Sequence, residues 1–96
     1  MNDLRWSGLR QLDVDDLIVL TLLAEGKTAT QVSDHLGLTP PAVSHRFTKY
    51  TDIFDKEEFF LKVKGRRIPS EYGMRMCRIA QEALKVLTCE EEDPEN

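Results

Sequence analysis

Hydrogen-bonding and cationic side chains are concentrated in two short stretches of this 96-residue sequence. Hydroxyl, imidazole, guanidinium and ammonium groups follow a proline pair in TPPAVSHRFTK (residues 39–49), and cations cluster in KVKGRR (residues 62–67). Such side chains pair with phosphate oxygens and with the edges of bases. The candidate contact residues are these side chains and the residues that begin the helices around them, namely Thr28, Thr39, Pro40, Pro41, Ser44, His45, Arg46, Thr48, Lys49, Lys64, Arg66 and Arg67.

The histidines and cysteines do not form a metal site or a catalytic site. His35 and His45 have no nearby nucleophile and no set of further metal ligands, and Cys77 and Cys89 are too few for a structural zinc site. On a straight helix these cysteines would lie about 18 Å apart, which is too far for a disulfide. We therefore expect no metal, no cofactor and no enzymatic activity.

Charge is distributed unevenly along the sequence. The net charge is −4, but residues 39–67 carry seven basic and four acidic side chains, whereas residues 89–96 carry five acidic ones. A partner responds to the local charge, so the basic middle segment is compatible with a nucleic-acid partner. The acidic end has no core-forming residue after Cys89 and is predicted to be disordered.

Apolar runs are short throughout the chain. The longest, Leu17–Leu23, is far below the roughly 20 residues that a membrane-spanning helix needs. Acidic residues also occupy the N-terminal region, where a signal peptide would need basic and apolar ones. We therefore expect a cytoplasmic protein with one compact domain and no membrane partner.

Two helices are predicted before the proline pair. Acidic residues from Asp13 and a glycine at position 26 mark the start and the end of the first helix. Thr28 caps a second helix over residues 29–36, and Gly37 ends it. Upstream, a short helix or an extended arm is predicted from the spacing of Leu4, Trp6, Leu9 and Leu12.

A third helix is predicted to begin abruptly at the prolines. Thr39 caps it, and Pro40 and Pro41 occupy its first positions, where a missing N–H costs nothing. It should run to about Tyr50 or beyond. Its inner stripe is predicted to be Ala42, Val43, Phe47 and Tyr50, and its solvent-facing side chains Ser44, His45, Arg46, Thr48 and Lys49.

A basic hairpin and a long helix are predicted to follow. Phe59, Leu61 and Val63 alternate with Phe60, Lys62 and Lys64, Gly65 supplies a turn, and residues 66–68 return as a second strand. Ser70 then opens a final helix that ends near Thr88. The predicted fold is mainly α with a small β-hairpin wing, a winged helix-turn-helix with a long C-terminal dimerisation helix. We divide the chain into a DNA-binding domain (1–69), a linker helix (70–88) and an acidic tail (89–96).

The stretch LTLLAEGKTATQVSDHLGLTPPAVSHRF (residues 20–47) resembles the DNA-binding domain of LysR-type transcriptional regulators. Thr39, Pro41 and the triplet at 42–44 match the start of that family's recognition helix, and the FFLK segment approximates its Leu-Phe-x-Arg strand with one residue inserted before it. Ser70 and Gly73 match the opening of its linker helix. The resemblance covers roughly residues 9–87. It implies a dimeric transcriptional regulator that binds double-stranded DNA.

The sequence also departs from that family. Pro40 replaces a glutamine that commonly contacts DNA, so the base preference does not transfer, and Ala29 replaces a usual aromatic residue. LysR-type regulators usually continue into an effector-binding domain, whereas this chain ends in an acidic segment. The resemblance therefore implies DNA binding, and no small-molecule effector site is expected in this chain.

The final helix carries two apolar stripes. One comprises Tyr72, Met76, Ile79, Ala83 and Val86, and one stripe is needed to cover the core. The other is then free to pair with a second copy, as linker helices do in the resembled family. The predicted homodimer interface comprises Gly73, Cys77, Ala80, Leu84 and Leu87.

Two alternatives remain open from the sequence. The helix-turn-helix segment is also similar to the wingless four-helix domain of LuxR-type regulators, although KVKGRRIPSEYG favours a wing. A winged helix that binds a protein partner is the second alternative, because the net negative charge weakens nonspecific attraction to DNA.

Overall fold

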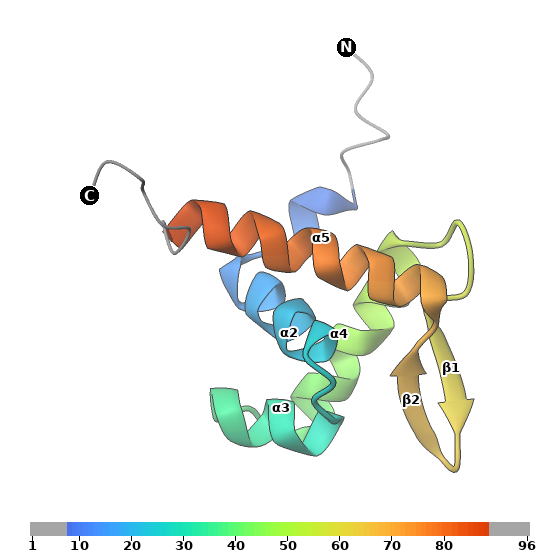
Figure 1. Cartoon of the computed structure of the whole chain (residues 1–96). Coiled ribbons are helices and arrows are strands. Elements are labelled where there is room, and N and C mark those ends of the chain that lie inside the picture. Colours follow the sequence, from blue (N-terminus) through green and yellow to red (C-terminus); the bar gives the residue numbers. More distant parts are fainter. Residues whose placement is uncertain (1–7, 89–96) are drawn as a thin grey trace.

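Residues 8–88 are described by the computed structural model, and they form helices beside a small antiparallel hairpin (Figure 1). This arrangement confirms the predicted fold class. The predictions for Leu4 and Trp6 and for the segment 89–96, with Cys89, lie outside the described residues. In chain order the elements are η1 (Leu9–Gln11), α2 (Val14–Ala24), α3 (Ala29–Leu36), α4 (Pro40–Ile53), β1 (Phe60–Val63), β2 (Arg66–Pro69) and α5 (Glu71–Thr88).

Side-chain caps begin α2, α3 and α4 at the predicted positions. The Asp13 and Thr28 side chains each accept a hydrogen bond from the N–H three residues on, and the residue there accepts one from the cap in return. Thr39 accepts from an N–H of the first turn of α4, and Pro40 and Pro41 are the first two residues of that helix. These contacts satisfy N–H groups that have no partner inside the helix, so each helix begins sharply.

Gly37 makes the turn from α3 into α4. Its φ of 68° lies in the left-handed region that favours glycine, and its N–H donates to the Ser33 carbonyl. The Ser33 hydroxyl donates to the Leu38 carbonyl at 2.5 Å, which closes the turn from the other side. In Figure 1, α4 runs from α3 toward the loop that precedes β1. The two helices are thus joined by a rigid connection.

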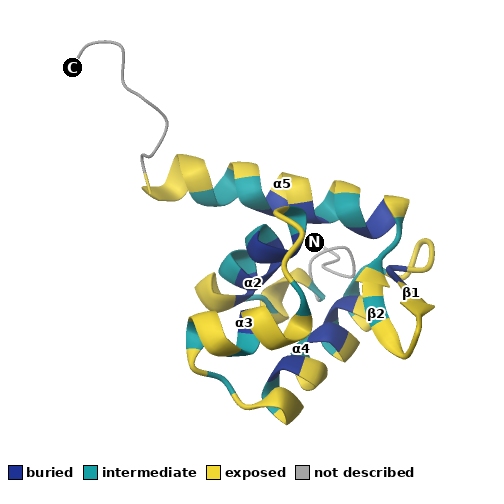
Figure 2. Ribbon diagram, turned by 60° about the horizontal axis from the view of Figure 1, so that its bottom comes forward, coloured by how far each residue is buried: buried dark blue, intermediate teal, exposed yellow. Residues whose placement is uncertain are grey.

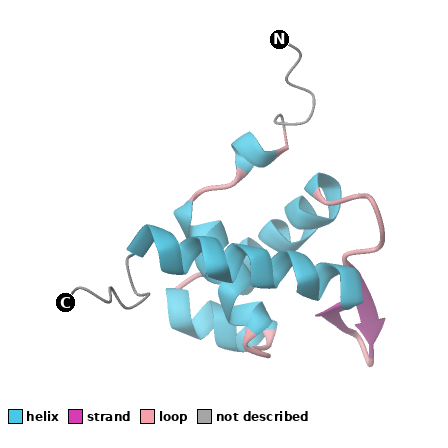
Figure 3. Ribbon diagram, turned by 45° about the horizontal axis from the view of Figure 1, so that its top comes forward, coloured by secondary structure: helices cyan, strands magenta, loops and turns pink. Residues whose placement is uncertain are grey.

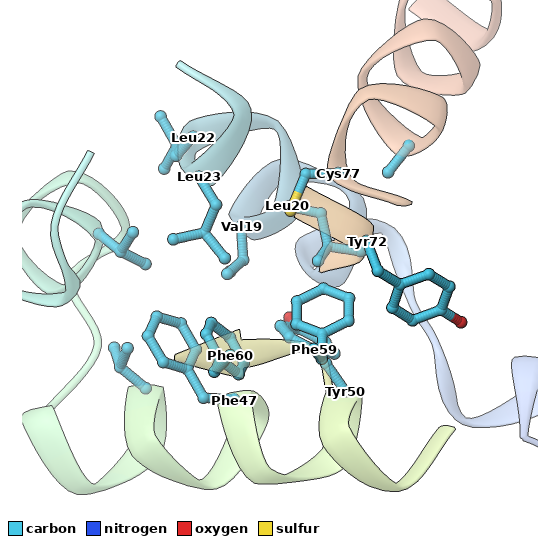
Figure 4. Close-up of a cluster of buried hydrophobic side chains, with 13 residues drawn as sticks. Val19, Leu20, Leu22, Leu23, Phe47, Tyr50, Phe59, Phe60, Tyr72 and Cys77 are labelled. Atoms are coloured by element: carbon cyan, nitrogen blue, oxygen red, sulfur yellow. The ribbon is translucent and has the colours of Figure 1, made fainter. Parts of the chain in front are cut away.

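The core lies among α2, α4 and α5, and aromatic side chains at the base of the hairpin close it (Figure 4). Leu20 and Leu23 of α2 are buried together with Phe47 of α4. The Phe47 and Phe60 rings stack with their centroids 4.8 Å apart, and the Phe59 ring lies equally close to Phe60. The stripe predicted for α4 is inside: Val43, Phe47 and Tyr50 are buried and Ala42 is half-buried.

The hairpin turns through Lys64 and Gly65, which have φ angles of 52° and 79°. Two positive φ angles in succession match the twist of the flanking strands. The two strands form a single antiparallel hairpin (Figure 3), in which Leu61 pairs with Ile68 and Lys62 with Arg67. The predicted alternation does correspond to a strand. Only the first residue of β1 is buried, however, so neither face of this strand is buried along its length. The presence of this hairpin contradicts the wingless alternative.

The prediction for the free face of α5 is wrong in part. Gly73, Cys77 and Ala80 were assigned to a dimer interface, but all three are buried inside the chain, where α5 lies across α2 (Figure 1). Gly73 approaches Phe59 so closely that an added Cβ would lie 2.2 Å from the Phe59 carbonyl oxygen. The small side chains therefore allow close packing within one copy. Of the remaining two, Leu84 is half-buried and Leu87 is exposed.

Candidate nucleic-acid interface

The outward face of the first part of α4, up to Lys49, is polar and carries no acidic residue, whereas Asp52 is exposed further along the same helix. Figure 2 shows α3 and α4 below α2, with α5 across the top, and exposed residues on the lower side of α4. No acidic side chain occurs between Thr39 and Lys49. This face therefore offers hydroxyl and imidazole groups beside two pyrrolidine rings. Its exposed candidate contact residues are Thr39, Pro40, Pro41, Ser44, His45 and Thr48.

Two cations of α4 turn into the protein, which corrects the prediction that Arg46 and Lys49 face solvent. Arg46 Nη1 lies 2.6 Å from Asp16 Oδ1, and Lys49 Nζ lies 2.6 Å from Asp16 Oδ2. The Tyr50 hydroxyl donates to the same carboxylate at 2.7 Å. Asp16 is fully buried, and the Arg46 and Lys49 side chains are each 19% exposed. A buried carboxylate without partners would be costly, so it holds these cations against the core.

Ionisation in this cluster follows from its contacts. Burial raises the pKa of Asp16, but hydrogen bonds from Lys49, Tyr50, the Asp13 backbone and Arg46 outweigh it and lower that pKa to about 2. Burial lowers the pKa of Arg46, but the hydrogen bond to Asp16 and its negative charge raise the pKa above its ordinary value. Burial and the hydrogen bond to Asp16 raise the pKa of Tyr50. At neutral pH the Asp16 carboxylate is therefore ionised.

Asp16 is the residue that sequence reasoning missed. The sequence pattern indicates it only as one of several acids that complement the dipole of α2. A usable signal exists, because Asp16 lies four and seven residues before Leu20 and Leu23 and so shares their apolar face. An acid on a buried stripe predicts a buried partner, which here is supplied by α4.

Arg67 joins the hairpin to α4. Its Nη2 donates to the Ser44 carbonyl at 2.9 Å and to Ser44 Oγ at 3.0 Å, and its Nη1 donates to Thr48 Oγ1 at 3.2 Å. The Arg67 Cζ atom also lies 5.5 Å from the Phe47 ring centroid and 5.6 Å from that of Phe60. The guanidinium is thus fixed by three hydrogen bonds and two aromatic faces.

The other predicted contact residues lie at the hairpin tip and at the start of α3. Lys64 and Arg66 are exposed, and so is the neighbouring Lys62. No acidic residue occurs between Phe60 and Pro69, so the hairpin is uniformly positive. Thr28 is half-buried at the start of α3, where its hydroxyl caps the helix.

Residues 8–88 contain no group of three or more His, Cys, Asp or Glu side chains that could hold a metal ion. Burial raises the pKa of the Cys77 thiol to about 12, so this cysteine is protonated and packs as an apolar side chain. No helix in this part of the chain is long and apolar enough to cross a membrane.

This chain is similar to known transcriptional regulators in sequence and in structure. The chain is 28% identical over 68 residues to the HTH-type transcriptional regulator SyrM 1 of Sinorhizobium fredii, a match that covers 71% of this chain and 20% of the relative. It superposes on the crystal structure of the probable transcriptional regulator PA0477 from Pseudomonas aeruginosa with a TM-score of 0.67 and 25% identity, covering 84% of this chain and 27% of that one. No family model matches the chain.

The predicted resemblance to the DNA-binding domain of LysR-type regulators is confirmed. This chain spans about a fifth of the length of SyrM 1 and about a quarter of the PA0477 chain. The similarity therefore concerns only that part of each regulator.

Proposed function

We propose that this chain is the DNA-binding module of a transcriptional regulator and that it places α4 in the major groove of double-stranded DNA. Its relatives are transcriptional regulators. The observation that carries the proposal is the exposed face of residues 39–49, which has no acidic side chain and is held beside a basic hairpin that also has none. A recognition helix needs a sharp start and small hydrogen-bonding side chains at the groove floor.

Different parts of this surface have different roles. Ser44, His45 and Thr48 lie on the outward face of α4 and are the proposed groove contacts, with Thr39 and the two prolines at the entry. Lys64 and Arg66 at the hairpin tip are the proposed phosphate contacts. Arg46 and Lys49, which are engaged by Asp16, are removed from the set of primary contacts.

We further propose that the chain binds DNA as a homodimer through α5. The exposed aliphatic residues of this helix are Ile79, Val86 and Leu87. Ile79 and Val86 lie off the line of Gly73, Cys77 and Ala80, whereas Leu87 continues that line beyond the core, and all three side chains are available to a second copy. A dimer would present two recognition helices to half-sites about one DNA turn apart, or a multiple of that distance.

The decisive experiment is selection of bound sequences from a random duplex pool, followed by titration of the selected duplex at several salt concentrations. We expect a recurring half-site, repeated at a spacing of about 10 base pairs or a multiple. Arg66→Ala should weaken binding to every duplex and reduce the salt slope by about one. A folded chain that binds no duplex at low salt would overturn the proposal.

A protein-interaction module is the second candidate, and one observation favours it. The face of the hairpin turned away from Arg67 exposes three aliphatic side chains, Leu61, Val63 and Ile68, each more than 40% exposed. Phosphate contacts would not use them. Retained fold without duplex binding in the experiment above would favour this alternative.

A further inference from the structure

Arg67 differs from the other hairpin cations because its guanidinium already has partners. Of its five N–H donors, three are engaged by Ser44 and Thr48 of α4. Lys64 and Arg66, by contrast, are exposed at the tip. A role in α4 geometry therefore fits Arg67 better than a simple phosphate contact.

The Arg67 contacts determine what the Thr48 hydroxyl can do. Threonine in a helix commonly donates its hydroxyl hydrogen to the carbonyl four residues earlier, as Thr21 does to Leu17 at 2.7 Å and Thr51 does to Phe47 at 3.3 Å. For Thr48 that carbonyl belongs to Ser44. One lone pair of this oxygen serves the helix ladder, and Arg67 Nη2 occupies the other at 2.9 Å.

The Thr48 hydroxyl is consequently biased toward donation outward, and the Ser44 hydroxyl also makes no donation within the described residues. Ser44 Oγ and Thr48 Oγ1 each accept a hydrogen bond from Arg67, and within residues 8–88 neither donates to a protein acceptor. Their hydrogens are thus uncommitted on the exposed face of α4. The two residues lie one helical turn apart, so the guanidinium fork orients both at once.

We propose that Arg67 is a positioning residue that presents the Ser44 and Thr48 hydroxyls as hydrogen-bond donors to acceptor atoms in the major groove. Those acceptors are purine N7, guanine O6 and thymine O4, whereas the amino group of cytosine would be disfavoured. The proposal rests on the DNA-binding function proposed above. It assigns base preference, rather than bulk affinity, to a residue of the wing.

The test compares Arg67→Lys with Arg66→Lys. Both changes keep the positive charge, but only Arg67→Lys removes a guanidinium that is hydrogen-bonded to α4. Affinity is measured for the selected duplex and for a duplex changed at the recognised positions, at several salt concentrations. Arg67→Lys should reduce the preference for the selected duplex about tenfold, with an unchanged salt slope. Arg66→Lys should leave that preference unchanged.

Removing the hydroxyls provides an independent test. Ser44→Ala with Thr48→Val should reduce the same preference, and adding Arg67→Lys to that double variant should then have little further effect. Circular dichroism and thermal unfolding of each variant establish that it is folded. If Arg67→Lys does not fold, the double variant alone decides, and an unchanged preference would overturn the proposal.

Two other results would contradict the positioning role, and they can be told apart. If Arg67→Lys keeps the wild-type preference and Arg67→Ala lowers the salt slope as Arg66→Ala does, Arg67 is a phosphate contact and the positioning role is wrong. If the wild type binds no duplex at low salt, the proposed function fails and the positioning role fails with it.

Discussion

Asp16 accepts four hydrogen bonds, and three of them come from α4. The donors are the Asp13 N–H, Arg46 Nη1, Lys49 Nζ and the Tyr50 hydroxyl, at 2.6–3.0 Å. Lys49 also donates to the Gln11 carbonyl at 3.0 Å, so the chain before α2 is tied to the same point. One buried carboxylate thus fixes the orientation of α4 relative to α2, and the groove-facing side of α4 depends on it.

Replacing Asp16 should therefore destabilise the fold. Asp16→Asn keeps the shape but leaves one acceptor oxygen among four donors and removes the charge that compensates Arg46 and Lys49. We expect a loss of about 3–5 kcal/mol in the free energy of unfolding, because breaking a buried ion pair leaves unpaired charges. Urea denaturation measures it.

The matched control is Asp15→Asn. Asp15 lies 3.9 Å from Arg46 but its side chain is 57% exposed, so we expect a change within about 0.5 kcal/mol. Equal losses for the two variants would contradict the role assigned to the buried carboxylate.

The low pKa of Asp16 also predicts a pH dependence of stability. The folded pKa of about 2 lies below the unfolded value near 3.8, so the unfolded chain binds the proton more readily and stability falls as the pH is lowered through this window. The Asp16 contribution, about 2 kcal/mol, is complete above pH 5. The difference in unfolding free energy between wild type and Asp16→Asn should therefore shrink by that amount between pH 6 and pH 2. A constant difference would show that Asp16 does not titrate in this window.

For helices and turns, the sequence predicts the features that depend on residues close by in the chain. Caps at Asp13, Thr28 and Thr39, and a left-handed glycine at position 37, act on residues within one turn of themselves, and each lies where the pattern indicates. Partners far apart in the sequence are different. Arg46 contacts Asp16 across 30 positions, and the residues around Arg46 do not indicate which distant side chain is its partner.

The same distinction explains the result for α5. Its two stripes have equivalent spacing, so periodicity does not say which one meets the core. The choice depends on Phe59, whose backbone carbonyl accepts from Ser70 N–H at 2.8 Å and leaves room only for a glycine at position 73. The start of α5 is thus positioned by tertiary contacts that spacing does not report.

Gly73→Ala tests that packing. Alanine improves helix propensity by about 1 kcal/mol, but its Cβ would lie 2.2 Å from the Phe59 carbonyl oxygen, and backbone must move to admit it. We expect a net loss of about 2 kcal/mol, measured by thermal unfolding. Glu82→Ala, at an exposed position of the same helix, should change stability by less than about 0.5 kcal/mol. An equally stable Gly73→Ala would refute the close approach.

Over the whole described chain, the cations near the proposed DNA-binding surface fall into two groups, one exposed and one paired with a buried carboxylate. The exposed cations of the hairpin lie beside the exposed face of residues 39–49, which has no acidic side chain, whereas the cations of α4 that face the core are neutralised by Asp16. Nonspecific attraction to DNA would therefore come from few side chains. A dimer would double the number of phosphate contacts while the DNA-facing surface of each copy stays the same. The exposed part of α5 matters because it is the proposed dimer interface.

Dimerisation should depend on the exposed aliphatic residues of α5. Ile79 and Val86 are 62% and 61% exposed and are seven residues apart, so they lie on one face of the helix. Ile79→Glu with Val86→Glu places two like charges against their counterparts in a second copy, and we expect a monomer in analytical ultracentrifugation. Binding to a duplex with two half-sites should weaken more than tenfold, while binding to a single half-site stays nearly constant.

Val14→Glu is the matched control, since Val14 is an aliphatic residue of α2 with 60% exposure. At the first position of α2 a glutamate also suits the helix dipole, so this variant should remain folded and dimeric. Dissociation by Val14→Glu as well would place the interface elsewhere. A wild type that remains monomeric at all concentrations, both free and on a duplex with two half-sites, would rule out the α5 homodimer and leave each module to read a half-site alone.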